Sequence, residues 1–272
     1  MAGLTFPNID PVAISIGPFS IHWYGLAYLL GVLLGAAYGQ TLLARKELWK
    51  DDKPPFEAGA IWDFAFWAVI GIVAGGRLGY VLFYNLPVYL ADPIQIFMIG
   101  DGGMSFHGGL VGLTLAVVLF TRSKGGRILS SLDLLGAIAT IGLFLGRVAN
   151  FINAELYGAP TDLPWGVIFP TDPEQVPRHP SQLYEALLEG LLLFVVVMIA
   201  TNVFKALRRP GLVAGIFGIG YGLSRIAVEF VRLPDAQIGY LFGGWFTMGM
   251  LLSLPILVAG VALVLYSGRR ND

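Results

Sequence analysis

The chain contains no cysteine, which excludes disulfide bonds, a thiolate nucleophile and a metal site built from thiolates. Charged residues are also scarce. They make up 13 % of the 272 residues, about half of the ~25 % typical of a soluble domain, while 56 % are hydrophobic. This composition indicates an integral membrane protein. The net charge of −1 carries no signature of nucleic-acid binding, and we expect no nucleic-acid partner.

Seven apolar runs are long enough to cross a bilayer, which takes about 20 residues. The third run is the shortest. No cationic segment precedes the first run, so we expect it to remain as a span rather than to be cleaved as a signal peptide. The runs cover approximately residues 20–42, 58–84, 105–121, 132–153, 183–204, 212–231 and 244–267.

The distribution of Lys and Arg predicts the orientation of these spans. Of the 17 cationic side chains, twelve fall in alternate loops or in the C-terminal tail, and only Arg178 and Arg232 fall on the opposite side. Because cytoplasmic loops carry an excess of Lys and Arg, the N-terminus is predicted outside and the C-terminus inside. The sequence thus predicts an all-α fold of seven transmembrane helices, as a single membrane domain over residues 1–272.

Two predicted outer connections have unusual compositions. Residues 85–104 are apolar and aromatic, lack Lys and Arg, and are broken by proline and glycine, which is typical of an arm lying in the membrane interface. Residues 154–181 are rich in proline and polar groups and predict a small folded cap on the periplasmic side. We expect Phe169 and Trp165 to form the core of this cap. The alternative is that they anchor the cap in the membrane interface.

Polar side chains gather near the predicted outer ends of the spans, where lipid does not satisfy them. Helical spacing places Tyr221, Arg225 and Glu229 on one face of the sixth span. Each Arg–Glu pair alone is explained by structural ion pairing between spans. Two arginines and a histidine at one depth predict a site for an anion such as a lipid phosphate. The side chains at this depth are Tyr24, Arg77, His107, Arg147, Asn150, Asn153, Glu185, Glu189, Arg225 and Glu229.

Glycines recur at every fourth residue in several spans, for example Gly71, Gly75 and Gly79. This spacing predicts close helix packing through small-residue faces. The segment HGGLVG at 107–112 lacks the preceding strand and the lysine of a phosphate-binding loop. Its glycines are therefore expected to bring the backbone close to a neighbouring span or to a ligand.

The segment GRVANFINAELYG at 146–158 resembles the signature of the prolipoprotein diacylglyceryl transferase family, G-R-x-x-N-F-x-N-x-E-x-x-G, at every motif position. Four further segments resemble the family in the same order along the chain. They are IHWYGLAY at 21–28, SFHGGL at 105–110, RHPSQLYE at 178–185 and SRIAVEFVRLPDAQ at 224–237.

The resemblance implies an enzyme of the bacterial cytoplasmic (inner) membrane whose active site faces the outer leaflet. Its donor would be phosphatidylglycerol, and its acceptor the cysteine thiol in the lipobox of a preprolipoprotein signal peptide. The product would be a thioether to diacylglycerol, with glycerol phosphate as the leaving group. No cofactor and no metal ion would be needed, because the activated bond is already in the lipid.

Site residues follow from the resemblance as hypotheses. Arg147 and Arg225 would bind the phosphate and stabilise the charge of the leaving group. His107, with an ordinary pKa of about 6.5, is the expected base for the thiol proton, and Tyr24 is a further catalytic candidate. Glu229 would orient Arg225, and Glu155 would position Arg147 or a loop group. The expected phosphatidylglycerol-binding residues are Arg147, Asn150, Asn153, Glu155, Gly158, Tyr221, Arg225 and Glu229.

Two other classes of protein compete with this hypothesis. A transporter or channel would place its polar site near the midplane at the junction of repeated halves, and the sequence has no convincing internal repeat. A scaffold protein whose arginines only pair spans would not need titratable groups gathered from several spans. Release of glycerol phosphate from labelled lipid would distinguish the three classes.

Overall fold

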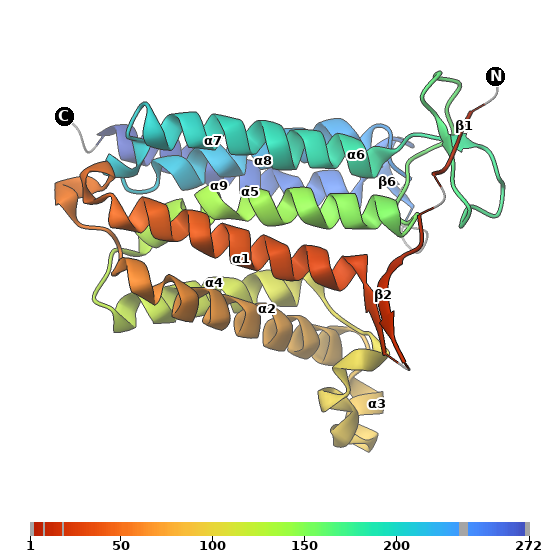
Figure 1. Cartoon of the computed structure of the whole chain (residues 1–272), viewed down its shortest axis with the longest axis horizontal. Helices are drawn as coiled ribbons and strands as arrows, with labels where there is room; N and C mark the ends of the chain where they lie inside the picture. The colour runs from red at the N-terminus through yellow and green to blue at the C-terminus, as the bar shows by residue number, and fades with distance from the viewer. Residues whose placement is uncertain (1–2, 8, 18, 234–238, 270–272) are drawn as a thin grey trace. The chain divides into compact units, whose positions relative to one another are not determined.

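The computed structural model describes residues 3–7, 9–17, 19–233 and 239–269, without the side chains of Asp101, Phe106 and His107. The chain forms two compact units. The first combines Met1–Tyr38 with Asp133–Asp272, and the second is Gly39–Leu132. The boundaries between the units fall within two long helices, α1 and α5 (Figure 1).

Helices make up most of both units. The long helices are α1 (Trp23–Ala44), α2 (Ile61–Phe83), α4 (Phe106–Ser123), α5 (Ile128–Ile152), α8 (Leu212–Glu229) and α9 (Met248–Arg269). One further continuous helix combines α6 (Ser181–Glu185), a π-helical stretch η6 (Ala186–Leu192) and α7 (Leu193–Asn202). The short helices are α3 (Leu86–Ala91), η1 (Lys46–Leu48), η2 (Lys50–Asp52), η3 (Ala58–Ala60), η4 (Pro93–Phe97), η5 (Ile99–Asp101) and η7 (Ala206–Arg208).

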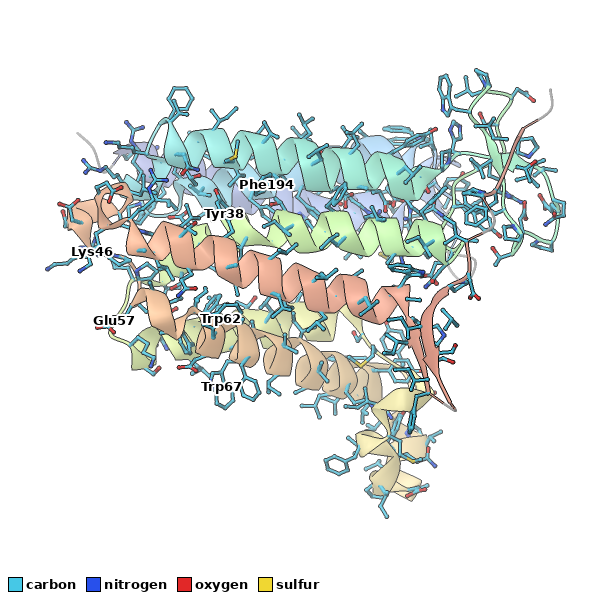
Figure 2. The ribbon with its side chains drawn as sticks, viewed as in Figure 1. Tyr38, Lys46, Glu57, Trp62, Trp67 and Phe194 are labelled. Carbon is cyan, nitrogen blue, oxygen red and sulfur yellow. The ribbon has the colours of Figure 1, made fainter. Side chains whose placement is uncertain are left out.

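Six helices are long and apolar enough to cross a membrane in the part of the chain that the structure describes. At most 39 % of each apolar segment is buried, and large side chains such as Trp62 and Trp67 of α2 point outward (Figure 2). Such exposed apolar surface is expected of helices that contact lipid. The predicted third span corresponds to α4, whose 18 residues are about 27 Å long against a hydrocarbon core of about 30 Å. The count of seven spans therefore stays a prediction.

The described residues are mostly helical, in agreement with the all-α prediction, and seven short strands accompany the helices. The predicted first and last spans begin too early, because Phe19–His22 (β3) and Phe246–Thr247 (β7) are strands. β3 pairs with β2 (Val12–Ile16), and β7 pairs with β6 (Tyr240–Phe242), both antiparallel. A third small sheet has β4 (Val167–Ile168) between β1 (Leu4–Thr5) and β5 (Pro177–Arg178). The alternation of apolar and polar residues in VAISI and FSIH was the available signal for the first hairpin.

In the second unit, α2 and α4 pack through glycine. A Cβ atom added at Gly71 would lie 2.5 Å from the carbonyl oxygen of Gly112, and one at Gly79 would lie 2.7 Å from the Cα atom of Gly108. Any side chain would therefore force the helices apart. The predicted packing through small-residue faces is confirmed for this pair of helices, and it also explains the glycines of HGGLVG.

Residues 85–104 form short helices beyond the end of α2 (Figure 1). They are held by Arg77, whose buried guanidinium donates five hydrogen bonds of 2.5–3.2 Å to their backbone carbonyl oxygens. The ring of Tyr89 covers the same guanidinium, 5.1 Å from its centre. Since all five N–H donors are occupied, Arg77 has none left for an anion. Its role is to fix the fold of this segment.

In the first unit, residues 154–181 fold into a cap beyond the end of α5 (Figure 1). Its small core consists of Phe169, fully buried, with Phe6, Phe151 and Tyr157 around it. Trp165 is half-exposed instead and donates a hydrogen bond of 2.7 Å to the hydroxyl of Tyr184. The prediction of a cap with its own core is thus correct for Phe169 and wrong for Trp165. Elsewhere in the unit, the rings of Tyr38 on α1 and Phe194 on α7 lie 5.6 Å apart (Figure 2).

Candidate active site

Three arginines and three glutamates form one cluster in the first unit. Arg147 lies five residues before the end of α5, Arg225 and Glu229 lie one turn apart at the end of α8, and Arg232 follows α8. Glu185 ends α6, and Glu189 lies one turn further in η6. The three arginine side chains remain 12–19 % exposed, whereas all three glutamates are buried.

Glu185 is the centre of this cluster. Its Oε2 lies 2.8 Å from Nε of Arg147, and its Oε1 lies 2.5 Å from Nη1 of Arg225 and 2.7 Å from Nη1 of Arg232. One carboxylate therefore joins guanidinium groups from α5, α8 and the segment after α8. Removing it would take their common counter-ion from three mostly enclosed cations, which is destabilising.

Glu229 is the second fixed carboxylate. Its Oε1 lies 2.5 Å from Nη2 of Arg225 and 3.2 Å from Nε of Arg232, and its Oε2 accepts a hydrogen bond from the Thr247 hydroxyl. The expected ion pair between Glu229 and Arg225 is therefore present. Gly249 makes room for it, because a Cβ atom there would lie 2.5 Å from the carboxyl carbon of Glu229.

Glu189 is held differently. Its Oε2 lies 3.6 Å from Nη2 of Arg147, and neither of its oxygens accepts a hydrogen bond from the residues that the structure describes. The π-helical stretch around it packs against α5, where a Cβ atom at Gly190 would lie 2.6 Å from Cβ of Phe144. Stretches of π-helix occur often at functional sites.

The two asparagines of the motif bind to its glutamate. Oε1 of Glu155 accepts hydrogen bonds from Nδ2 of Asn150, at 2.8 Å, and from Nδ2 of Asn153, at 3.4 Å. The carboxylates that contact Arg147 are Glu185 and Glu189, so the alternative in which Glu155 positions Arg147 is not the one observed. Each amide keeps a second N–H for another acceptor.

A cavity of about 610 Å³ adjoins these residues, lined by Ile21, His22, Tyr24, Gly25, Asn153 and Glu155. The hydroxyl of Tyr24 lies 3.0 Å from that of Tyr28 and within electrostatic range of Glu155 and Arg147. Tyr221 lies within the same range of Glu189, Arg225 and Arg147. The cavity thus borders Tyr24 on α1 and Asn153 and Glu155 just after α5, all of which the sequence analysis selected. A volume of this size is typical of small-molecule sites.

Gly158 occupies a position where a side chain does not fit. Its N–H donates to the carbonyl oxygen of His179 at 2.8 Å, and a Cβ atom would lie 2.8 Å from Cβ of His179 and in contact with the carbonyl oxygen of Val231. The close backbone approach expected of Gly158 is therefore present. It joins the cap to the segment that carries Arg232.

The cap contains its own buried ion pair. Asp172 accepts hydrogen bonds from Arg178 at 2.6 and 2.9 Å, and these hold the pKa of the Asp172 carboxyl below its ordinary value. His179 lies 3.2 Å from the Tyr184 hydroxyl through Nδ1, and its burial lowers the pKa of the imidazole. His179 is therefore neutral at pH 7.

The predicted site residues other than His107 all lie in the first unit. His107 begins α4 in the second unit, and its side chain lies outside the described residues. Sequence reasoning noticed Glu185 and Glu189 as polar groups but gave them no role, and it missed His22 and Arg232. The spacing of Glu229 and Arg232, three residues apart at a helix end, was the signal that could have found Arg232.

Comparison with known proteins agrees with this geometry. The family model of the prolipoprotein diacylglyceryl transferases matches residues 11–266. A phosphatidylglycerol–prolipoprotein diacylglyceryl transferase of Agrobacterium fabrum is 55 % identical over 97 % of this chain and 94 % of its own length. The proteins of the same name from Brucella anthropi and Brucella canis are 53 % and 55 % identical, each over 96 % of this chain and 92 % of their own length.

Proposed function

The chain belongs to the prolipoprotein diacylglyceryl transferase family, and on this premise we propose that it transfers the diacylglyceryl group of phosphatidylglycerol to the lipobox cysteine of preprolipoproteins. This reaction is the first step of lipoprotein maturation. A bond forms between the thiol sulfur and a glycerol carbon of the lipid, and the bond from that carbon to the phosphate oxygen breaks. Glycerol phosphate leaves, and the thiol proton is released.

The observation that carries the proposal is the cluster of three partly exposed guanidinium groups between apolar helices, together with a cavity of about 610 Å³ whose lining residue Tyr24 lies within electrostatic range of Arg147. Negative charge develops on the departing phosphate, and guanidinium donors stabilise such charge most in a site of low dielectric constant. Arg147 and Arg225 retain N–H donors beyond those bound to carboxylates, because each guanidinium has five. Glu185 and Glu229 fix the orientation of these donors.

The cavity is the proposed site of the lipid headgroup. Asn150 and Asn153, held by Glu155, would donate their remaining N–H groups to glycerol or phosphate oxygens. Tyr24 and Tyr221 would hydrogen-bond the same headgroup. His107 remains the proposed base, and His22 competes with it because it lines the cavity. A thiol with a pKa of about 8.5 is partly ionised near neutral pH, so the base is expected to matter less than the arginines.

The proposed setting is the bacterial cytoplasmic membrane. The chain would form a single polytopic domain, crossing seven times with its N-terminus outside and its C-terminus inside. Residues 85–104 would lie in the outer interface, and residues 154–181 would cover the site on the periplasmic side. Both substrates are embedded in the membrane, so they would enter from the side, between spans.

The decisive experiment uses purified protein in detergent, phosphatidylglycerol and a synthetic peptide with a lipobox cysteine. Mass spectrometry would detect a diacylglyceryl adduct on sulfur, and the same peptide with serine in place of cysteine is the control. We expect an adduct that requires both the lipid and the thiol. Folded protein that binds the anionic lipid without forming an adduct would refute the transferase and favour a lipid-binding or transport protein.

A further inference from the structure

Glu189 differs from the two other carboxylates of the cluster. Glu185 contacts three arginines, and Glu229 contacts two arginines and the hydroxyl of Thr247. Both oxygens of Glu189 lack a hydrogen-bond donor among the described residues, and the Arg147 guanidinium is 3.6 Å away. The side chain is nevertheless fully buried. Glu189 is thus a buried carboxyl group without the donors that would stabilise its ionised form.

This difference determines which carboxyl accepts a proton most readily. An ionised carboxylate buried without donors has a large desolvation cost, and protonation removes that cost. Glu185 and Glu229 are kept ionised by the guanidinium groups around them. Protonating either of them would remove a counter-ion from at least two partly exposed arginines at hydrogen-bonding distance. Protonation at Glu189 would disturb only the long contact with Arg147.

A proton on Glu189 would change the net charge that the cluster presents to a lipid phosphate. With all its members ionised, three guanidinium groups face three carboxylates, and the cluster has no net charge for a lipid phosphate. One proton on Glu189 leaves a net charge of +1, which matches the single negative charge of a phosphodiester. In a site of low dielectric constant, such a match decides whether the anion binds.

We infer, resting on the proposed function, that Glu189 takes up one proton as the phosphate of phosphatidylglycerol binds at Arg147. Glu189 is thereby a positioning residue: its neutral form leaves Arg147 available to the lipid. The charged and titratable groups that face Glu189 come from α5, α6, α8 and the segment after α8. They are Arg147 on α5, Glu185 on α6, Tyr221 and Arg225 on α8, and Arg232 after α8.

The test is the pH dependence of phosphatidylglycerol binding to the full chain in detergent, between about pH 5 and about pH 8. The phosphodiester stays singly charged in this range, so any proton taken up belongs to the protein. The affinity of the unmodified protein is expected to fall by up to about tenfold per pH unit as the pH rises, which is the signature of one proton bound with the ligand. Glu189→Gln, which imitates the neutral carboxyl, is expected to keep binding and to lose this slope.

Matched controls are His22→Asn and His107→Asn, because histidine titrates in the same range. Both are expected to retain the slope. A slope that persists in Glu189→Gln, that disappears with either histidine, or that is absent from the unmodified protein would overturn the inference. If Glu189→Gln fails to fold, infrared difference spectra of the unmodified protein test the inference instead. Binding of the lipid is expected to produce the band of a protonated carboxyl group. The absence of this band would overturn the inference.

The thioether assay in the same preparation separates this inference from the function on which it rests. An adduct without proton uptake refutes the role of Glu189 and leaves the transferase standing. Proton-linked binding without an adduct refutes the transferase.

Discussion

Arg147 illustrates how a guanidinium is kept in an apolar helix while donors remain for a ligand. Its Nε lies 2.8 Å from Oε2 of Glu185, and the side chain is 19 % exposed. The ion pair lowers the cost of holding the cation between apolar helices, and the exposed part stays accessible to a ligand. A structural ion pair and a binding site are therefore compatible in this residue.

Arg147→Ala is expected to abolish transfer. Loss of one donor to a developing anion typically lowers the turnover rate by about 10² to 10³-fold, and this change also leaves Glu185 with one cation fewer. Arg147→Lys is the matched variant, which keeps the charge without the planar fork of donors. Adduct formation is measured by mass spectrometry. Turnover of Arg147→Ala at the unmodified rate would contradict the role of Arg147, whereas His107→Asn is expected only to slow the reaction.

Acid is expected to loosen the cap through Asp172. The pKa of this carboxyl is lowered in the folded state, so its contribution to stability is complete above the ordinary carboxyl pKa of about 4. That contribution is lost as the pH falls through the lowered, folded-state pKa. Hydrogen-exchange protection of residues 154–181 should therefore decrease in strong acid. Asp172→Asn should show low protection already at pH 7 and a weaker decrease, and an unchanged profile would contradict the assignment.

At the scale of elements, one arginine determines the shape of residues 85–104. The short helices of this segment leave backbone carbonyl groups that no regular helix satisfies. Arg77 of α2 donates five hydrogen bonds to these carbonyl oxygens. One side chain thus connects α2 to η4 and to the residues on either side of η5.

Arg77→Ala is expected to release this segment from α2 without unfolding the long helices. Bonds from a charged donor contribute about 1.5–3 kcal/mol each, and the variant loses five of them. Hydrogen exchange should increase strongly in peptides covering residues 93–104. Lys53→Ala, an exposed cation in the same unit, is the control and should leave those peptides unchanged. Equal exchange in both variants would refute the role of Arg77.

At the scale of the whole molecule, the absence of cysteine makes topology directly measurable, since each introduced cysteine is the only one in the chain. Asp92→Cys and Asp162→Cys, both at exposed positions, are expected to react with an impermeant maleimide added to intact cells. Lys53→Cys and Lys124→Cys should react only after the membrane is opened. Labelling of Asp92→Cys and Lys124→Cys from the same side would show that α4 does not cross the membrane. The number of transmembrane helices would then be six.

The composition and local pattern of the sequence were sufficient to predict the long helices, the motif residues and the family. The long helices follow from apolar runs of the required length, and the motif residues from Gly146 to Gly158 were identified individually. The family follows from motifs that match in order along the chain, because such a pattern depends only on residue types and spacing.

Only the tertiary structure decided which partners the polar groups have. Arg77 and Arg147 look alike in sequence, as single arginines in apolar helices, yet one binds backbone carbonyls and the other faces glutamates of another helix. Glu185 and Glu189 also look alike, one turn apart, yet the first contacts three arginines and the second has no hydrogen-bond donor among the described residues. Hydrogen bonds and ion pairs act over a few ångströms, so they depend on how helices distant in sequence pack, which spacing along one helix does not specify.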